Sequence, residues 1–438
     1  MRAAAARRFF AGQGMLGVLV LLVALFSLLT IRDQHPTGEA AARALETKLA
    51  AVAAPGETIL VVARGGPEDQ RFASTLAARL RARGLTVAGP VAGEPPEIRA
   101  AVEQLALAPG ARRWIATLES SRAVVESIRD AVPGLKDTTI AVPASRRWPT
   151  FLLRDNLRNV AGQIAVIAIV AVGMTLVIIA GGIDLSVGSL IALSAVVCAW
   201  LLKALGGVGA GAGAMCVAAA GAVVLCALSG AFSGAMVVRF RLPPFIATLA
   251  MMQVASGVAY IIARGRPIYD APDAFTALGR GVDPLLGVPW AVWLMLLLYA
   301  LGHVLMSRTA LGRYVYAVGG NQEAARLAGV RTGGVLLLTY VVSGALAGLG
   351  GVVMASQLKS GAPTYGVMYE LYVIAAVVVG GTSLSGGEGR VLGTLVGAFI
   401  IAVIQNGMNL TNVESYTQKV VLGLVILGAV LLDRIRRR

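Results

Sequence analysis

The sequence predicts an all-α membrane protein of about ten transmembrane helices, with a small doubly wound α/β domain inserted outside the bilayer. Three observations lead to this prediction. Of the 438 residues, 57% are hydrophobic and only 14% are charged, with a mean hydropathy of +0.77. Such a chain has too few polar groups to cover a soluble globule. Apolar runs recur along the chain, and the interval 32–148 is rich in charge instead.

A helix needs about 20 mainly apolar residues to cross a bilayer. Ten stretches meet or approach that length, and the eighth and tenth are short. They are 14–31, 161–182, 185–205, 211–238, 244–263, 288–306, 333–355, 367–380, 392–408 and 420–432.

The basic residues indicate the topology. The net charge is +15, and Lys and Arg gather at alternate ends of the spans, including Arg7 and Arg8 before the first and 434–438 after the last. The positive-inside rule then predicts that both termini are cytoplasmic and that 32–148 is periplasmic or extracellular. Charges placed in this way favour a bilayer and argue against nucleic acid as a partner. Because no small-residue cleavage site follows the first apolar run, we expect residues 1–31 to remain as an anchor.

Within 32–148, short apolar runs alternate with helical patterns. Strands are predicted at 58–63, 85–91, 113–118 and 138–142, and helices at 68–83, 96–107 and 121–132. This order predicts a parallel, doubly wound sheet. An alanine-rich helix at 38–53 is expected to form a stalk before it.

This inserted domain resembles one lobe of the type I periplasmic sugar-binding proteins in its order of elements. Phe72 falls near the place where that family has sugar-stacking phenylalanines, which makes it a candidate ligand contact. No second lobe is present in the sequence to close over a ligand. Three roles remain open: a docking or regulatory module, a tethered partial binding lobe, or a purely structural element.

Two glycine-containing turns, 181–188 and 380–387, resemble each other and are expected at the cytoplasmic face. Paired glycines let the chain leave one helix, and Asp184 or Ser383 is expected to cap the next by accepting a backbone N–H. This local sequence similarity aligns Gly181 with Gly380 and suggests that the membrane region consists of two related halves. The turn residues of interest are Gly181, Gly182, Asp184, Ser186, Gly380, Gly381, Ser383 and Ser385.

The segment 308–332 is a polar, basic loop between two apolar spans. It carries four arginines and one acidic residue, Glu323, so it is expected in the cytoplasm. Within it, 321–329 reads as a short helix that Asn321 caps and Gly329 ends. The alternative is a solvent-exposed basic loop that binds no partner and only stops transfer of the chain across the membrane.

Four blocks of the chain resemble ABC importer permeases of the ribose/xylose/inositol type. They are GMTLVIIAGGIDLSVGSL (173–190), RLPPFIATL (241–249), GNQEAARLAGV (320–330) and YELYVIAAVVVGGTSLSGGEGRVLGTLVGA (369–398). The resemblance covers 149–438 and leaves 32–148 outside it. It implies a bacterial inner-membrane subunit that pairs with a second permease subunit. It also implies that ATPase subunits dock on 308–332, and that a periplasmic binding protein delivers a monosaccharide or polyol. The implied ATPase contacts are Gly320, Asn321, Glu323, Ala324, Ala325, Arg326 and Gly329.

The chain has no phosphate-binding loop of the G-x-x-x-x-G-K-[ST] type, because no lysine follows a glycine. ATP and Mg are therefore expected on a separate ATPase. We expect this chain to bind no cofactor or metal and to perform no catalysis.

Polar residues inside spans tend to face the interior of a bundle, where they line a pathway or hold helices together. Glu370 stands out because an acidic residue at mid-membrane costs about 2.5–3.5 kcal/mol on insertion scales, and we expect it near the outer side. The candidate pathway residues are Gln253, Tyr340, Glu370, Tyr372, Gln405 and Asn406.

Two other functions stay open. A permease for branched-chain amino acids or another small polar solute would share the membrane core, and assays with the partner binding protein would separate these cargoes from a sugar. A membrane receptor using the α/β domain would need a cytoplasmic signalling domain, for which 434–438 is too short.

Overall fold

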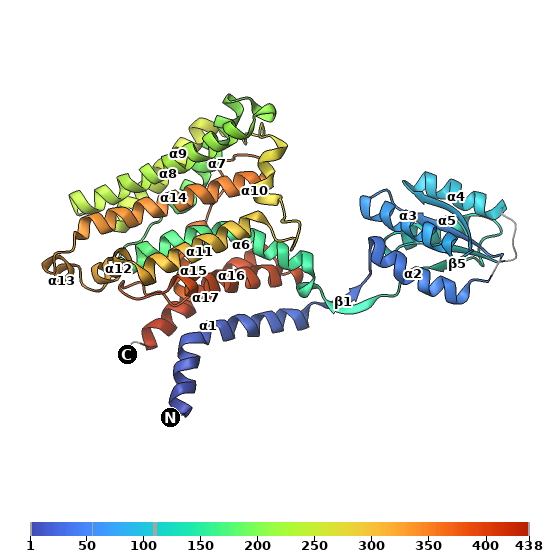
Figure 1. The fold of residues 1–438 in the computed structure, drawn as a ribbon, viewed down its shortest axis with the longest axis horizontal. Coiled ribbons are helices and arrows are strands. Elements are labelled where there is room, and N and C mark those ends of the chain that lie inside the picture. Colours follow the sequence, from blue (N-terminus) through green and yellow to red (C-terminus); the bar gives the residue numbers. More distant parts are fainter. Residues whose placement is uncertain (1, 55, 108–111, 437–438) are drawn as a thin grey trace. The chain divides into compact units, whose positions relative to one another are not determined.

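The computed structural model describes residues 2–54, 56–107 and 112–436 (Figure 1). Its contacts divide the chain into an α/β unit, Ile31–Thr150, and a helical unit formed by the segments before and after it. Arg437 and Arg438, two of the basic residues predicted to be cytoplasmic, lie outside the described residues.

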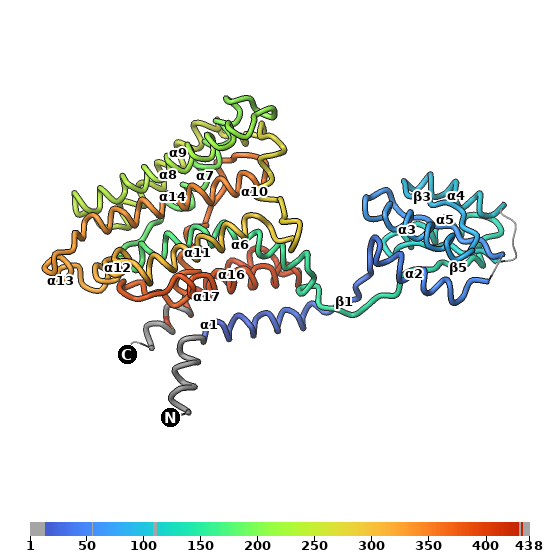
Figure 2. The backbone as a smooth tube through the Cα atoms, viewed as in Figure 1, coloured from blue at the N-terminus to red at the C-terminus, as the bar shows by residue number. Residues whose placement is uncertain are grey.

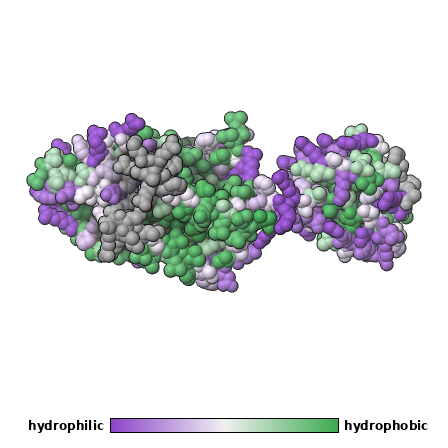
Figure 3. All heavy atoms as spheres, turned by 90° about the horizontal axis from the view of Figure 1, so that it is seen from below, coloured by the Kyte–Doolittle hydropathy of each residue, from purple (hydrophilic) through white to green (hydrophobic). Residues whose placement is uncertain are grey.

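The helical unit confirms the prediction of a multi-pass helical membrane protein. In the described part of the chain, seven helices are long and apolar enough to cross a bilayer. They are α6 (Arg154–Ile179), α7 (Val187–Ala204), α8 (Ala212–Phe240), α9 (Pro244–Ala263), α11 (Trp290–Arg308), α14 (Thr332–Leu358) and α16 (Val391–Leu410). Figure 3 shows hydrophobic side chains spread over the visible face of this unit.

The other three predicted spans coincide with helices whose apolar stretches are shorter. These helices are α1 (Arg2–Leu29), α15 (Tyr369–Val379) and α17 (Ser415–Arg436). The count of ten spans therefore remains a prediction. The remaining helices are α10 (Ala277–Arg280), α12 (Ala310–Gly320), α13 (Gln322–Leu327) and the 3₁₀ turns η1 (Thr150–Leu152), η2 (Gly207–Gly209) and η3 (Asp273–Thr276).

Helices α6, α7 and α14 form the buried centre of the helical unit. The most apolar window of α6 is 89% buried, whereas that of α8 is only 22% buried, so α8 lies at the periphery. Glycines let the backbones approach closely: a Cβ on Gly344 of α14 would overlap the Cys226 carbonyl of α8 and lie 3.1 Å from the Gly230 Cα. Close packing of this kind replaces the hydrophobic effect, which lipid does not provide between helices.

The α/β unit contains the predicted elements in the predicted order. Its four parallel strands lie in the order β3-β2-β4-β5. The strands are β2 (Thr58–Ala63), β3 (Thr86–Ala92), β4 (Arg113–Ala116) and β5 (Thr139–Ala141). One face of the sheet packs against α2 (Gly38–Val52) and α3 (Pro67–Ala82), and the other against α4 (Pro95–Leu107) and α5 (Glu119–Ala131).

The prediction that 38–53 forms a stalk is wrong. Helix α2 belongs to the core of the α/β unit, because Leu45 and Leu49 are buried against α3. Its Glu46 is buried and accepts hydrogen bonds from Arg79 and from Arg83, which hold the pKa of this carboxyl below its usual range. The chain enters and leaves the unit instead through an antiparallel ribbon of β1 (Ile31–Gln34) and β6 (Arg146–Pro149).

Candidate functional site

Helix α13 forms where the sequence predicts it, with the predicted caps. The Asn321 Oδ1 accepts a hydrogen bond from the Ala324 N–H at 2.9 Å, which satisfies one of the free donors of the first turn. Gly329 follows the helix with a φ of +86°, a conformation that favours glycine. Figure 2 shows α12 and α13 together at one end of the helical unit.

The exposed face of α13 carries a pair of opposite charges. Glu323 accepts from the Arg326 Nη2 at 2.5 Å and from its Nε at 3.0 Å, and these bonds lower the pKa of Glu323. Both side chains are more than 60% exposed. Because an ion pair this exposed stabilises a fold little, the two charges remain available to a partner. Gly320 and Ala324 are exposed on the same segment.

Two residues of α13 differ from the expected contact set. Ala325 is only 5% exposed and packs into the core of the helical unit, so the prediction that it contacts a partner is wrong. Leu327 is 76% exposed, and the sequence analysis missed it. The missed signal is an isolated leucine in a polar loop, two positions from the alanine that anchors the same helix.

A groove of about 340 Å³ lies beside α13, between α12 and the start of α14. It is lined by Leu311, Tyr314, Gly329, Val330, Arg331, Gly334 and Val335. We call this groove, together with the exposed side chains of α13, the α13 surface.

The two glycine turns end their helices in the same way. Gly181 donates to the Ile178 carbonyl and Gly182 to the Val177 carbonyl; the Gly381 and Thr382 amides repeat this pattern with Val378 and Val377. Gly181 and Gly381 have φ values of +87° and +90°. Both turns are therefore Schellman caps. By its hydrogen bonds and φ, Gly181 corresponds to Gly381, whereas the sequence similarity aligns it with Gly380.

The prediction that Asp184 and Ser383 cap the following helices is wrong. The Asp184 Oδ1 accepts from the Ser186 N–H at 3.0 Å, and the Ser383 Oγ accepts from the Ser385 N–H at 3.1 Å. Both bonds close short turns before the helices begin. Helix α16 starts only at Val391, well beyond the reach of Ser383.

Asp184 is fully buried inside the helical unit. Its Oδ1 also accepts from the Ser186 hydroxyl at 2.6 Å, and its Oδ2 accepts from the Ser343 hydroxyl at 2.7 Å. Ser343 belongs to the middle of α14, so this carboxylate ties the α6–α7 turn to a central helix. The Tyr340 hydroxyl, one turn earlier on α14, lies against Gly182 of the same turn.

Helix α15 begins inside the bundle. It has only 11 residues, too few to cross a bilayer alone. The chain before it runs along α7: Gly361 lies against the Ala195 carbonyl and Gly366 against that of Gly188. A non-helical stretch, 361–368, thus interrupts the run of helices before α15, and α15 itself covers most of the predicted span 367–380.

Glu370 lies at this interruption, in the first turn of α15. Its carboxylate lies against Gly188, in the first turn of α7, where a Cβ would overlap it. The half-buried carboxylate therefore lies near the first turns of both α15 and α7. Tyr372 follows on α15, and its ring packs edge-on to that of Tyr369 at 6.2 Å.

The remaining pathway candidates are not brought together. Gln253 is exposed on α9. The Asn406 side chain exchanges hydrogen bonds with that of Asn156 at 2.9 and 3.0 Å, so it joins α16 to α6. Gln405 is half-buried beside it on α16.

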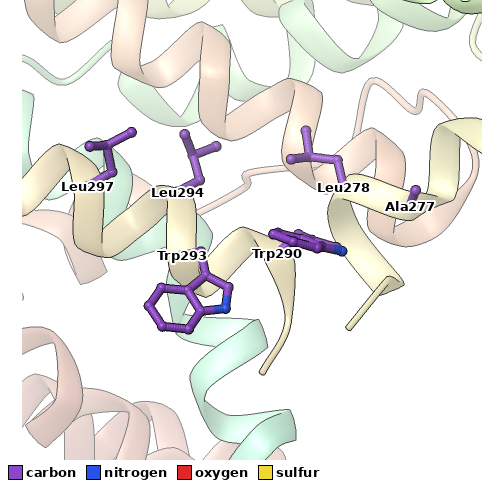
Figure 4. Close-up of a pocket in the computed structure, with 6 residues that line it drawn as sticks. All are labelled: Ala277, Leu278, Trp290, Trp293, Leu294 and Leu297. Atoms are coloured by element: carbon purple, nitrogen blue, oxygen red, sulfur yellow. The ribbon is translucent and has the colours of Figure 1, made fainter. Parts of the chain in front are cut away.

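Two further features offer little to a polar ligand. Phe72 is fully buried in the core of the α/β unit, so its ring is not presented to a ligand. A groove of about 380 Å³ between α10 and α11 is lined by Ala277, Leu278, Trp290, Trp293, Leu294 and Leu297 (Figure 4). These apolar side chains and indoles suit a membrane interface better than the hydroxyls of a sugar.

A bundle of long apolar helices, with a short helix and a half-buried carboxylate among them, has the architecture of a multi-pass membrane protein. The family model for the branched-chain amino acid transport system / permease component matches residues 156–430, and the chain belongs to this family.

Individual relatives are more specific. The chain is 45% identical over 289 residues to the ribose import permease protein RbsC of Escherichia coli K12, a match that covers 65% of this chain and 87% of that protein. It is 42% identical to RbsC of Haemophilus influenzae over 291 residues, and 34% identical to the L-arabinose transport system permease protein AraH of E. coli K12 over 290 residues. These matches cover 65% and 66% of this chain and 87% and 86% of the relatives. No solved structure matches.

Proposed function

We propose that this chain is the membrane subunit of an ABC importer that carries a monosaccharide, and that the sugar is a pentose. The relatives named for ribose and L-arabinose support the substrate class. The observation that carries the mechanism is the α13 surface. Within it, a short helix anchored through buried Ala325 exposes Glu323, Arg326 and Leu327. A separate ATPase binds ATP and Mg and docks there.

The rest of the assembly follows from the same proposal. A second permease subunit completes the pathway across the inner membrane, and a periplasmic binding protein delivers the sugar. Both termini and α13 lie in the cytoplasm, as the distribution of Lys and Arg indicates. The α/β unit lies on the opposite side, where it docks the binding protein or regulates release.

We place the sugar pathway beside the interruption before α15. Backbone outside a helix is tolerated at membrane depth only where protein or a water-filled cavity surrounds it. Transporters often bind their substrates at such discontinuous helices. Glu370 offers a carboxylate acceptor for sugar hydroxyls at that point, and Tyr372 offers an aromatic face.

Replacing Glu323 with lysine is expected to uncouple ATP hydrolysis from import. The change places like charges side by side on α13, and it alters an exposed pair whose loss costs the fold little. We expect normal amounts of protein in the membrane and a fall in import of about tenfold. The measurement is sugar uptake and sugar-stimulated ATP hydrolysis by the reconstituted complex.

Glu39→Lys is the matched control, because Glu39 forms a similarly exposed pair with Arg43 in the α/β unit. Normal uptake by Glu323→Lys would refute the docking assignment. A bulky residue at Gly329 should behave like Glu323→Lys, since the positive φ at Gly329 resists any side chain.

Replacing Glu370 with glutamine is expected to raise the KM for import about tenfold, because a charge-assisted hydrogen bond to a sugar hydroxyl is lost. Binding of the ATPase should not change, since Glu370 lies in the bundle interior. Gln253→Leu is the comparison, since the structure places Gln253 on an exposed surface. Equal KM values for Glu370→Gln and the unmodified protein would remove Glu370 from the pathway.

A further inference from the structure

Helices α12 and α13 are joined by a single residue that belongs to both. The Asn321 N–H donates to the Ala317 carbonyl at 3.0 Å and closes the end of α12. The side chain of the same residue accepts from Ala324 and opens α13. Since one residue completes both helices, a displacement of α13 acts directly on the last turn of α12.

That last turn meets two other segments through backbone alone. A Cβ on Gly319 would overlap the Ile179 carbonyl oxygen at the end of α6 and would lie 2.7 Å from the Gly387 nitrogen. The Gly387 N–H in turn donates to the same Ile179 carbonyl at 2.8 Å. Three segments far apart in sequence thus meet where no side chain fits. We call this meeting point the Gly319 junction.

A side-chain hydrogen bond reinforces the junction. The Tyr316 hydroxyl, one turn before Gly319 on α12, donates to the Gly389 carbonyl at 2.8 Å. Gly389 follows the α15–α16 turn that Gly387 belongs to. Helix α12 therefore holds this turn at two points. Gly320, the exposed residue next to Gly319, has nothing within 4 Å of where its Cβ would be.

The two segments held at the junction lead to the buried polar groups of the bundle. Beyond Ile179, the chain turns to Asp184, which is bonded to Ser343 of α14. The α15–α16 turn follows α15, the short helix whose first turn carries Glu370. Packed backbone without intervening side chains is stiff, because it has no rotamers to absorb a displacement.

From these contacts we infer that the Gly319 junction passes the movement of α13 to the pathway helices, and that Gly319 and Tyr316 are positioning residues for coupling. The inference rests on the proposed docking of an ATPase at α13. The inferred route carries movement of α13 through α12 to the ends of α6 and α15. This route is distinct from the covalent continuation of α13 into α14.

The test is the number of sugar molecules imported per ATP hydrolysed by the full complex in proteoliposomes, for three variants. Gly319→Ala inserts a methyl group into the junction, Tyr316→Phe removes one hydrogen bond without adding volume, and Gly257→Ala makes the same glycine-to-alanine change in open space on α9, away from the junction and the α13 surface. We expect this ratio to fall about tenfold for Gly319→Ala and about twofold for Tyr316→Phe, within the range of coupling effects along packed networks. We expect no change for Gly257→Ala.

The outcomes separate the two proposals. If neither the unmodified complex nor Gly257→Ala imports sugar when ATP is hydrolysed, the proposed function fails. If both import normally and Gly319→Ala imports as much sugar per ATP as they do, the junction is not the route of coupling. Should Gly319→Ala fail to reach the membrane, Tyr316→Phe decides: an unchanged ratio for that variant overturns the inference.

Discussion

Replacing Asp184 with alanine is expected to destabilise the helical unit by several kcal/mol and to abolish import. The carboxylate accepts hydrogen bonds from the Ser186 amide, the Ser186 hydroxyl and the Ser343 hydroxyl, all inside the bundle. Alanine leaves these donors unpaired, at about 1–3 kcal/mol for each buried group. It also frees the α6–α7 turn from α14. The measurement is the melting temperature of the purified protein in detergent, together with sugar uptake.

Asp184→Asn and Ser343→Ala serve as graded controls. Asparagine keeps an oxygen for the two Ser186 donors, and its amide can donate to the Ser343 hydroxyl, so most of the stability should return. Ser343→Ala removes one partner and should cost about 1–3 kcal/mol. An Asp184→Ala protein as stable as the unmodified one would show that this carboxylate does not hold the turn to α14.

Replacing Gly344 with valine is expected to prevent correct packing of α14 against α8. Its Cβ would overlap the Cys226 carbonyl oxygen, and the Gly230 Cα lies close behind. Overpacking of a side-chain core typically costs about 1–3 kcal/mol. We expect more here, because backbone atoms cannot change rotamer to make room. The measurement is the amount of monodisperse protein recovered from membranes, which should fall severely.

Gly334→Val is the matched control for this prediction. Gly334 lies on the same helix, and nothing lies within 4 Å of where its Cβ would be. Both variants introduce the same β-branched residue into α14, so the change in residue type is matched. Equal recovery of the two variants would contradict the close approach of α8 and α14.

The sequence predicted the parts of the fold that depend on local pattern. Span-length apolar runs mark the helices, and short apolar runs such as 58–63 mark the strands of the α/β unit. The caps of α13 were predictable because Asn321 and Gly329 act on backbone only a few residues away in the sequence. By contrast, the role of α2 depends on packing against α3. An alanine-rich amphipathic helix fits a stalk and a core equally well, so the sequence could not distinguish them.

The candidate site was predictable in outline only. Its exposed charges lie in one short segment, but which face of α13 is buried depends on the bundle beneath it. Ala325 was therefore assigned to the exposed side in error, and exposed Leu327 was missed. The contact of Asp184 with Ser343 and that of Gly319 with Ile179 join residues far apart in the chain. A single sequence contains no local signal for such pairs.

The most direct test of the account is the import of labelled ribose into proteoliposomes that contain this chain with and without its ATPase, in the presence of the binding protein. The account predicts ATP-dependent accumulation only when the ATPase is present, and its loss when Glu323 is replaced with lysine. Equal import by this chain alone, without ATPase or ATP, would contradict it.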